Sequence, residues 1–291
     1  MTRGQGGSRG PGGRGPGGRQ DGGGPGERPG RAKKRFGQHF LEPAWVARVI
    51  DALDPQPDQT FVEIGPGRGA LTRPLASRVA AVIAIEIDRD LAAALPSRLP
   101  ANVTVVQGDV IETDFEALLR GVPHPVRVVG NLPYNVASPI LFRLLHDAAD
   151  GGRFSDATLM LQKEVADRVA AVPGSADYGA LGIQVALLAE VERVLTLPPG
   201  AFRPPPKVTS AVVRLSFRPP AAAVGDLATF ERIVRGIFQQ RRKTLANAFR
   251  PVADSLGRSA ADVIAAAAVD GSRRPEQLTL QDFARLARAV L

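Results

Sequence analysis

The sequence predicts an α/β fold, in which helices cover a largely parallel β-sheet, followed by a small helical domain. From Thr60 onward, short β-branched runs alternate with helical patterns, as is typical of parallel strands joined by helical crossovers. The first of these runs ends in a glycine-rich loop that leads into a helical pattern. After Pro219-Pro220 the strand signals stop, and only helical patterns follow.

The predicted strands are short runs rich in β-branched residues and bounded by turn residues. The last two are separated by a loop over residues 198–207 that contains three consecutive prolines, and we expect this pair to form an antiparallel hairpin. The predicted strands are Thr60–Ile64, Val82–Ile87, Val103–Gln107, Val126–Val129, Ala157–Leu161, Val191–Leu197 and Ser210–Phe217.

The predicted helical domain follows the last strand, and its final helix is opened by a proline in the first turn. At the other end of the chain, residues 1–31 repeat Gly, Pro and Arg without apolar periodicity, so they cannot bury enough surface to offset the entropy of ordering. We predict a disordered tail over 1–31, an α/β domain over 32–219 and a helical domain over 220–291. The helices expected in the last domain are Leu227–Phe249, Ala260–Ala268 and Pro275–Leu291.

The chain of 291 residues carries a net charge of +8. In the tail, six Arg stand against Asp21 and Glu27, which gives +4 and leaves +4 for the remainder. A basic excess points toward an anionic partner, most commonly nucleic acid. Charge alone does not choose among RNA, DNA and a membrane surface, and it serves solubility equally well.

Composition disfavours several other classes of protein. No apolar run approaches the roughly 20 residues of a membrane-spanning helix, and the start of the sequence lacks the apolar segment of a signal peptide. The absence of Cys excludes disulfides and thiolate metal sites, and His39, His124 and His146 lack a helical metal-binding spacing. We therefore expect a cytoplasmic protein without a membrane partner or a catalytic metal.

The glycine-rich loop after the first strand predicts a nucleoside cofactor. Glycines at Gly65, Gly67 and Gly69 allow a sharp turn and a close approach of the backbone to a ligand. The next strand closes with Glu86, 21 residues beyond Gly65, where a carboxylate can accept hydrogen bonds from both hydroxyls of a ribose. Because Gly65, Gly67 and Ala70 also satisfy a permissive G-x-G-x-x-G/A pattern, an NAD cofactor remains open at this point.

Asp109 follows the third strand in the sequence Gly108-Asp109-Val110. The carboxyl ends of parallel strands meet at one edge of the sheet, so this carboxylate can accept a hydrogen bond from the exocyclic amine of a cofactor adenine. An Asp after a strand is also a common helix cap or turn residue, and this alternative stays open.

The fourth strand runs into Asn131-Leu132-Pro133-Tyr134, the most specific signal in the chain. The nitrogen lone pair of an adenine amine is delocalised into the ring, and acceptors from Asn131 and a backbone carbonyl make it more nucleophilic by holding its protons. Tyr134 offers a face on which the base stacks, worth about 1 to 3 kcal/mol. An amide, a proline and an aromatic have no obvious use in hydride transfer, so the segment favours methyl transfer to adenine over an NAD enzyme.

These segments together resemble the small-subunit ribosomal RNA adenine N6,N6-dimethyltransferases, the KsgA or RsmA family. The resemblance extends from about Arg35 to the end of the chain. Two features depart from the family pattern, namely His39, where Asn is frequent, and the Gly/Arg-rich tail. The matching segments are 36–41, 63–69, 86–88, 108–109, 131–134, 162–165, 202–210 and 240–245.

The resemblance implies a Rossmann-like seven-stranded fold with S-adenosyl-L-methionine as cofactor, and it assigns roles to individual residues. In the cofactor site, His39 and Leu41 would lie against the cofactor, Gly65 at its methionine part, Glu86 at the ribose and Asp109 at the adenine amine. Asn131 would stand between cofactor and target base, where it is the expected catalytic residue together with Tyr134. Phe202 would cover the target adenine opposite Tyr134. Arg241, Arg242 and Lys243, on a helix that opens the small domain, would contact RNA phosphates, unless they only form a solvated helix face.

The implied reaction is the transfer of methyl groups to N6 of two adjacent adenosines in a hairpin loop near the 3′ end of 16S rRNA. The expected partner is 16S rRNA within a small ribosomal subunit or its precursor, and we expect a monomer. The nearest alternative is a macrolide-resistance methyltransferase acting on 23S rRNA, which shares the fold, the cofactor and most of these motifs. The segments at 162–165 and 240–245 favour the small-subunit enzyme. A non-catalytic RNA-binding assembly factor would not need Asn131, and an NAD-dependent oxidoreductase would transfer hydride instead of methyl.

Overall fold

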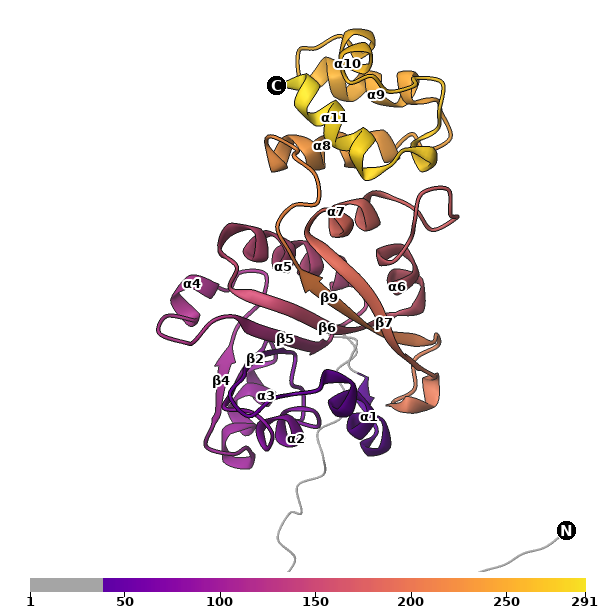
Figure 1. The fold of residues 1–291 in the computed structure, drawn as a ribbon. Coiled ribbons are helices and arrows are strands. Elements are labelled where there is room, and N and C mark those ends of the chain that lie inside the picture. The colour runs from indigo at the N-terminus through magenta and orange to yellow at the C-terminus, as the bar shows by residue number, and fades with distance from the viewer. Residues whose placement is uncertain (1–38) are drawn as a thin grey trace, which may run out of the picture. The chain divides into compact units, whose positions relative to one another are not determined.

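The computed structural model describes residues 39–291, and these form an α/β domain with further helices at the C-terminal end (Figure 1). The tail predicted over 1–31, and residues 36–38 of the first matching segment, lie outside the described residues. No helix of the described part is long and apolar enough to cross a membrane. The described strands are β1 (Phe40–Leu41), β2 (Thr60–Ile64), β3 (Ala81–Glu86), β4 (Val103–Gln107), β5 (Val126–Asn131), β6 (Phe154–Gln162), β7 (Ala189–Leu197), β8 (Phe202–Arg203) and β9 (Ser210–Phe217).

The described helices connect these strands and then continue beyond β9. The α-helices are α1 (Pro43–Leu53), α2 (Thr72–Ala76), α3 (Arg89–Ala94), α4 (Phe115–Leu118), α5 (Ala137–Gly151), α6 (Lys163–Val169), α7 (Ala180–Leu188), α8 (Leu227–Phe238), α9 (Leu245–Ser255), α10 (Ala260–Ala266) and α11 (Leu280–Val290). Short 3₁₀ helices are η2 (Pro96–Arg98), η3 (Pro199–Ala201) and η4 (Pro275–Gln277).

The main sheet has seven strands in the order β4-β3-β2-β5-β6-β9-β7. Strands β2 to β6 pair in parallel, whereas β9 pairs antiparallel with both β6 and β7. The predicted α/β class, the seven strands and the antiparallel closing pair are therefore confirmed. The chain builds outward from β2 in one direction and from β5 in the other, so β2 and β5 form the switch point where open α/β sheets bind their ligands.

Alternate side chains of the strands enter two separate cores, one on each face of the sheet. In β2, Val62 and Ile64 belong to the core that also contains α5 and α7, whereas Phe61 packs with α1 and α2 on the other face. All five residues of this strand are buried, because a parallel strand covered on both sides has no solvent face.

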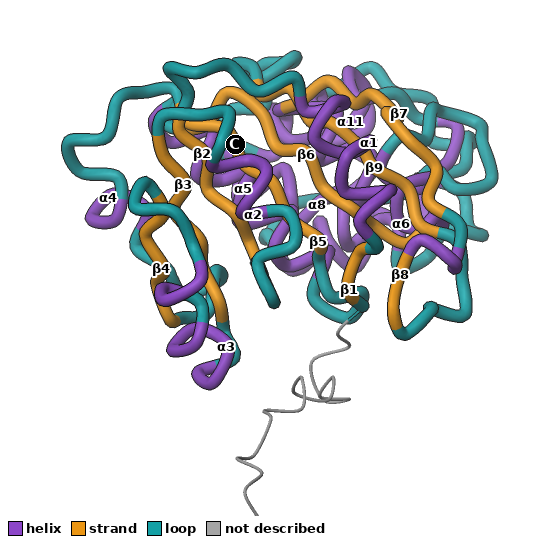
Figure 2. Tube along the Cα trace, turned by 90° about the horizontal axis from the view of Figure 1, so that it is seen from below, coloured by secondary structure: helices purple, strands orange, loops and turns teal. Residues whose placement is uncertain are grey.

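A second, two-stranded sheet was not predicted. The short strands β1 and β8 pair antiparallel, with Leu41 opposite Phe202, although they lie about 160 residues apart in the chain (Figure 2). Two-residue strands carry no periodic signal, and their pairing depends on where the larger sheet places the flanking loops. This pairing fixes the segment that enters the pocket described below.

The C-terminal helices differ from the prediction in two places. The predicted helix Leu227–Phe249 is interrupted between α8 and α9, because the backbone amide of Leu245 donates to the carbonyl of Arg273 (2.7 Å) instead of continuing α8. The proline at Pro275 opens only η4, and α11 begins at Leu280 after a capping box formed by Thr279 and Asp282. Helix α8 contacts α7 of the α/β part. The domain boundary at residue 219 remains a prediction.

Candidate active site

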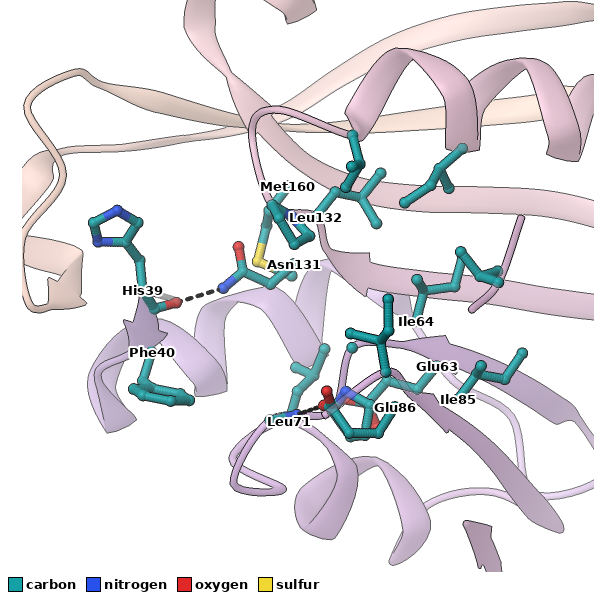
Figure 3. Close-up of a pocket in the computed structure, with 18 of the residues that line it drawn as sticks. His39, Phe40, Glu63, Ile64, Leu71, Ile85, Glu86, Asn131, Leu132 and Met160 are labelled. Atoms are coloured by element: carbon teal, nitrogen blue, oxygen red, sulfur yellow. Dashed lines mark hydrogen bonds between the residues drawn. The ribbon is translucent and has the colours of Figure 1, made fainter. Parts of the chain in front are cut away.

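A pocket opens at the carboxyl ends of β2 and β5, at the switch point of the sheet (Figure 3). Its walls come from the loops after β2, β3, β4 and β5 and from the segment that enters β1. Residues predicted separately from five positions along the chain thus meet in one place. The predicted site residues that line the pocket are His39, Leu41, Gly65, Glu86, Asp109, Asn131 and Tyr134.

The loop after β2 needs its glycines for two distinct reasons. Gly65, Gly67 and Gly69 have φ values of 69°, 59° and 74°, in the left-handed region that side chains with a Cβ rarely adopt. A Cβ on Gly67 would also lie 3.0 Å from a ring carbon of Phe40. The loop is held by the amide of Gly65, which donates to the carbonyl of Ile85 (2.9 Å) and so ties it to the end of β3.

Glu86 lies at the end of β3 and is only 4 % exposed. Its two carboxylate oxygens accept hydrogen bonds from the backbone amides of Gly67 and Asp88, both at 2.9 Å. Burial raises the pKa of Glu86, and the two amides act in the opposite direction by stabilising the charged form. The carboxylate is therefore fixed in orientation, and its remaining lone pairs are available to hydroxyl donors in the pocket.

Asp109 is oriented by its own loop after β4. One carboxylate oxygen accepts from the amide of Ile111 (2.9 Å), and the hydroxyl of Thr113 donates to the main-chain carbonyl of Asp109 (2.8 Å). Arg143 of α5 donates to the carbonyls of Ile111 and Thr113 and so holds this loop against the helix. The turn role and the ligand role considered from the sequence are compatible, because one oxygen serves the turn while the side chain lines the pocket.

Glu63 is a pocket residue to which the sequence argument gave no role. It lies in β2, is 2 % exposed, and its Oε2 has no hydrogen-bond partner in the described structure. Burial raises its pKa to about 7, and the nearby charge of Glu86 adds to the shift. An acidic residue within an otherwise apolar strand pattern was the available signal, since such a carboxyl is rarely buried without a partner.

Asn131 is the last residue of β5 and reaches across the pocket to the entering segment. Its side-chain Nδ2 donates to the main-chain carbonyl of His39 (2.8 Å), as Figure 3 shows. A carbonyl only accepts, so this contact assigns the amide orientation and directs Oδ1 away from His39. Gly130 allows the strand to approach β2 closely, because a Cβ there would lie 3.0 Å from the carbonyl oxygen of Ile64.

Tyr134 lies in the loop after β5, half-buried at the pocket. Its hydroxyl hydrogen-bonds with Oγ of Ser210 (2.8 Å), which anchors the ring to the start of β9. Burial raises the pKa of the phenol, which therefore stays neutral. The Tyr134 ring stacks with the imidazole of His39, with centroids 5.7 Å apart and an interplanar angle of 23°.

Four predicted residues are not in this pocket. Phe202, expected to cover the target base, is 2 % exposed in the core beneath β1 and β8, so its ring is not available for stacking in this structure. The sequence placed three basic residues on a helix, but in the structure they lie in the turn between α8 and α9. These residues are Arg241, Arg242 and Lys243. Arg241 pairs with Glu276 (3.1 Å) and donates to the carbonyl of Ala176, whereas Arg242 and Lys243 are exposed.

The sheet order, the glycine loop and the polar residues at the switch point define a Rossmann-like methyltransferase. The family model for ribosomal RNA adenine dimethylases matches residues 30–288, and the chain belongs to this family. It is thus an enzyme of the methyltransferase class, whose methyl donor is S-adenosylmethionine and whose substrate is ribosomal RNA.

Curated relatives and solved structures agree with this assignment. The chain is 47 % identical over 265 residues to the ribosomal RNA small subunit methyltransferase A of Xanthomonas euvesicatoria pv. vesicatoria. The aligned residues cover 89 % of this chain and 97 % of the relative. A dimethyladenosine transferase from Plasmodium falciparum has a TM-score of 0.73 at 28 % identity, covering 85 % of this chain and 96 % of the other. The 23S rRNA methyltransferase ErmE has a TM-score of 0.61 at 27 % identity, covering 86 % and 99 %.

Proposed function

We propose that the enzyme transfers methyl groups from S-adenosyl-L-methionine to N6 of two adjacent adenosines in a hairpin loop near the 3′ end of 16S rRNA. The product is N6,N6-dimethyladenosine, formed during biogenesis of the small ribosomal subunit. The observation that carries the proposal is the arrangement of Asn131 and Tyr134, an amide acceptor and an aromatic face at the rim of a nucleoside pocket. The relatives at 47 % identity named as small-subunit methyltransferases support the choice of subunit.

The pocket residues that lie away from Asn131 and Tyr134 fit the chemistry of the cofactor. Glu86 presents oriented carboxylate lone pairs to the ribose hydroxyls, and Asp109 presents an oxygen to the adenine amine. Gly65 leaves room for the methionine part, because its hypothetical Cβ meets nothing closer than 4.0 Å. Leu41 supplies apolar contact, and Glu63 offers a buried, unpartnered oxygen to an N–H donor. The cofactor supplies a methyl group already activated by its sulfonium, so these residues need only align it.

The residues of the rim act on the target adenine. Asn131 Oδ1 accepts one proton of the N6 amine and directs the nitrogen lone pair into the pocket, while Tyr134 holds the base by stacking. The base reaches this position only from an unstacked site, which favours a loop over a continuous duplex. Monomethylated adenine retains one N–H for Asn131 or a backbone carbonyl, so the same residues support the second transfer.

RNA outside the pocket is held by distributed phosphate contacts. Arg242 and Lys243, exposed in the turn between α8 and α9, are suited to this role. Arg241 is already paired with Glu276 and contributes less. We place the enzyme in the cytoplasm. We also propose that it is a monomer, and sedimentation of the purified protein would test its oligomeric state.

A 23S rRNA methyltransferase is the second candidate, because ErmE shares the fold at a TM-score of 0.61. The two candidates are separated by incubating the protein with labelled cofactor and either small subunits lacking the modification or large subunits, and then mapping the label. Label as dimethyladenosine in the 3′ hairpin of 16S rRNA is the expected result. Label in 23S rRNA would favour the second candidate, and RNA binding without label would indicate a non-catalytic assembly factor.

A further inference from the structure

Arg241, in the turn between α8 and α9, binds two segments that lie far from it in the chain. Its Nε donates to the carboxylate of Glu276 in η4 (3.1 Å), and its Nη2 donates to the main-chain carbonyl of Ala176 (2.8 Å). Ala176 belongs to the loop between α6 and α7, where the backbone amide of Gly174 donates to the main-chain carbonyl of Glu276 (2.8 Å). The turn, the loop and η4 are therefore joined in a closed ring, each to the other two.

The same three parts of the chain also meet in a buried layer. Tyr178, near the end of the loop, is 3 % exposed, and its hydroxyl donates to the main-chain carbonyl of Leu278 (2.8 Å), the residue after η4. Its ring packs edge-on against Phe238, the last residue of α8, with centroids 6.1 Å apart. Because this layer does not involve Arg241, the three segments should stay packed when the Arg241 side chain is removed.

The two basic residues that follow Arg241 have a different environment. Arg242 and Lys243 are exposed, and their side chains make no hydrogen bond or ion pair within residues 39–291. The charge of Arg241, in contrast, is balanced by Glu276, and two of its N–H groups already have protein acceptors. A cation neutralised in this way attracts a phosphate less, whereas a rigid planar guanidinium is well suited to join two acceptors in fixed directions. Arg241 thus binds the protein, and its two neighbours face solvent.

The loop between α6 and α7 connects this turn to a strand that lines the pocket. Strand β6 supplies Met160 to the pocket, and α6 begins directly after β6, at Lys163, and leads into the loop. The loop is therefore attached to the sheet through α6 and to the turn through Arg241. A binding group that is already fixed in place loses less conformational freedom when its ligand binds.

We propose that Arg241 is a positioning residue, whose contacts lock the turn against the loop and so present Arg242 and Lys243 to RNA phosphates at a fixed distance from the base pocket. The inference rests on the RNA contacts proposed above for these two side chains. It replaces the phosphate contact expected for Arg241 from the sequence. Because Arg241 acts through its two neighbours, its removal should weaken RNA binding only when they are present.

The test introduces Arg241→Ala and Glu276→Gln separately into two proteins. One is the wild type, and the other carries both Arg242→Ala and Lys243→Ala. Affinity for an RNA hairpin with two adjacent adenosines is measured at several salt concentrations. In the wild type, Arg241→Ala should weaken RNA binding about two- to fivefold, the equivalent of one exposed ion pair, with little change in the salt slope. In the second protein it should have no further effect.

Glu276→Gln is the sharper variant, because it removes a negative charge, which by electrostatics alone favours RNA binding. A loss of RNA affinity in this variant therefore reports loosening of the turn, and we expect such a loss in the wild type only. Its single-turnover rate at saturating RNA and its cofactor affinity should match the wild type, because Glu276 does not line the pocket. Glu190→Gln, which removes an exposed carboxylate paired with Arg218, is the matched control and should not weaken RNA binding.

Three results would overturn the inference. RNA affinity of Glu276→Gln equal to or above that of the wild type would show that the ion pair does not position the turn. A salt slope lowered by about 0.7 to 0.9 in Arg241→Ala would make Arg241 a phosphate contact. Equal losses of affinity in both proteins would show that it does not act through its neighbours.

The protein that carries both Arg242→Ala and Lys243→Ala separates this inference from the function on which it rests. It should bind RNA more weakly than the wild type. If it binds equally well, the phosphate contacts proposed for the turn are wrong, and the positioning role of Arg241 fails with them. If it binds more weakly while Glu276→Gln does not, only the positioning role fails.

Discussion

The cofactor half and the base half of the pocket are built in different ways. In the cofactor half, the carboxylates of Glu86 and Asp109 are held by backbone amides 2 to 19 residues away in the chain. In the base half, the contacts of His39, Asn131 and Tyr134 join residues 76 to 165 positions apart. Local backbone contacts make the first half visible in sequence spacing, whereas the second half exists only once the sheet has formed.

This difference predicts that substitutions in the two halves affect separate steps. Substitutions in the cofactor half should change cofactor affinity or local stability. Substitutions in the base half should change the rate of methyl transfer while leaving cofactor affinity near the wild-type value.

The largest effect is expected for Glu86→Ala, which removes a charged acceptor of two ribose hydrogen bonds. Each such bond contributes on the order of 1.5 to 3 kcal/mol, so cofactor affinity should fall by about 100-fold or more. Calorimetric titration measures this directly. Glu190→Ala, which removes an exposed carboxylate paired with Arg218, is the matched control and should bind normally. Unchanged affinity of the Glu86 variant would remove the ribose assignment.

Asn131→Ala should lower the rate of methyl transfer by about 100- to 1000-fold, by analogy with the loss of one oriented hydrogen-bonding group in other active sites. RNA affinity should change less, because phosphate contacts and stacking on Tyr134 remain. Single-turnover assays at saturating RNA give the rate. Asn131→Asp keeps an acceptor oxygen but loses the N–H that donates to His39. Its rate should therefore lie between the rates of the wild type and Asn131→Ala. A near-normal rate of the Ala variant would make the amide structural.

Glu63→Gln should change how stability depends on pH. Burial raises the pKa of Glu63 from 4.5 to about 7 in the folded protein, so between these values the folded state binds more protons than the unfolded state. The free energy of unfolding of the wild type should therefore fall as pH rises from about 4.5 to 7, by roughly 3 kcal/mol from this group.

Urea unfolding of the cofactor-free wild type and Glu63→Gln at pH 5 and pH 8 measures this contribution. The variant lacks the titrating carboxyl, so its stability relative to the wild type should be higher at pH 8 than at pH 5. A difference between the two proteins that does not depend on pH would show that Glu63 is not held protonated by burial.

The smallest effect is expected from the exposed residues between α8 and α9. Replacing Arg242 and Lys243 together by Ala should lower the slope of log affinity for RNA against log salt by about 0.7 to 0.9 per residue. Arg241→Ala, matched in charge, should change the slope less because its guanidinium is paired with Glu276. Equal slopes for the double variant and the wild type would leave these side chains as a solvated surface.

Most of the fold followed from sequence because its signals are local. The β-branched runs predicted each strand of the main sheet, and the glycine loop with Glu86 predicted a nucleoside site, which the structure places at the switch point. The small sheet of β1 and β8 did not follow, since two-residue strands have no period. The break between α8 and α9 was missed because it depends on the tertiary bond between Leu245 and Arg273.

The site was predictable to the extent that motifs specify residue types. The sequence identified Asn131 and Tyr134, but it could not reveal that His39 holds one through its carbonyl and covers the other with its ring. Phe202 was assigned by analogy with a motif, and its pairing opposite Leu41 instead buries its ring in the core. Glu63 was overlooked because the sequence does not show whether an acidic residue within a predicted strand is buried or exposed.

The most direct test of the separation between the two halves measures cofactor affinity and single-turnover rate together in Glu86→Ala and Asn131→Ala. The structure predicts that Glu86→Ala binds the cofactor weakly but recovers most of its rate at saturating cofactor. It predicts the reverse for Asn131→Ala, with cofactor affinity near that of the wild type and a rate that saturating cofactor and RNA do not restore. Loss of both quantities in both variants would contradict the division of the pocket into a cofactor half and a base half.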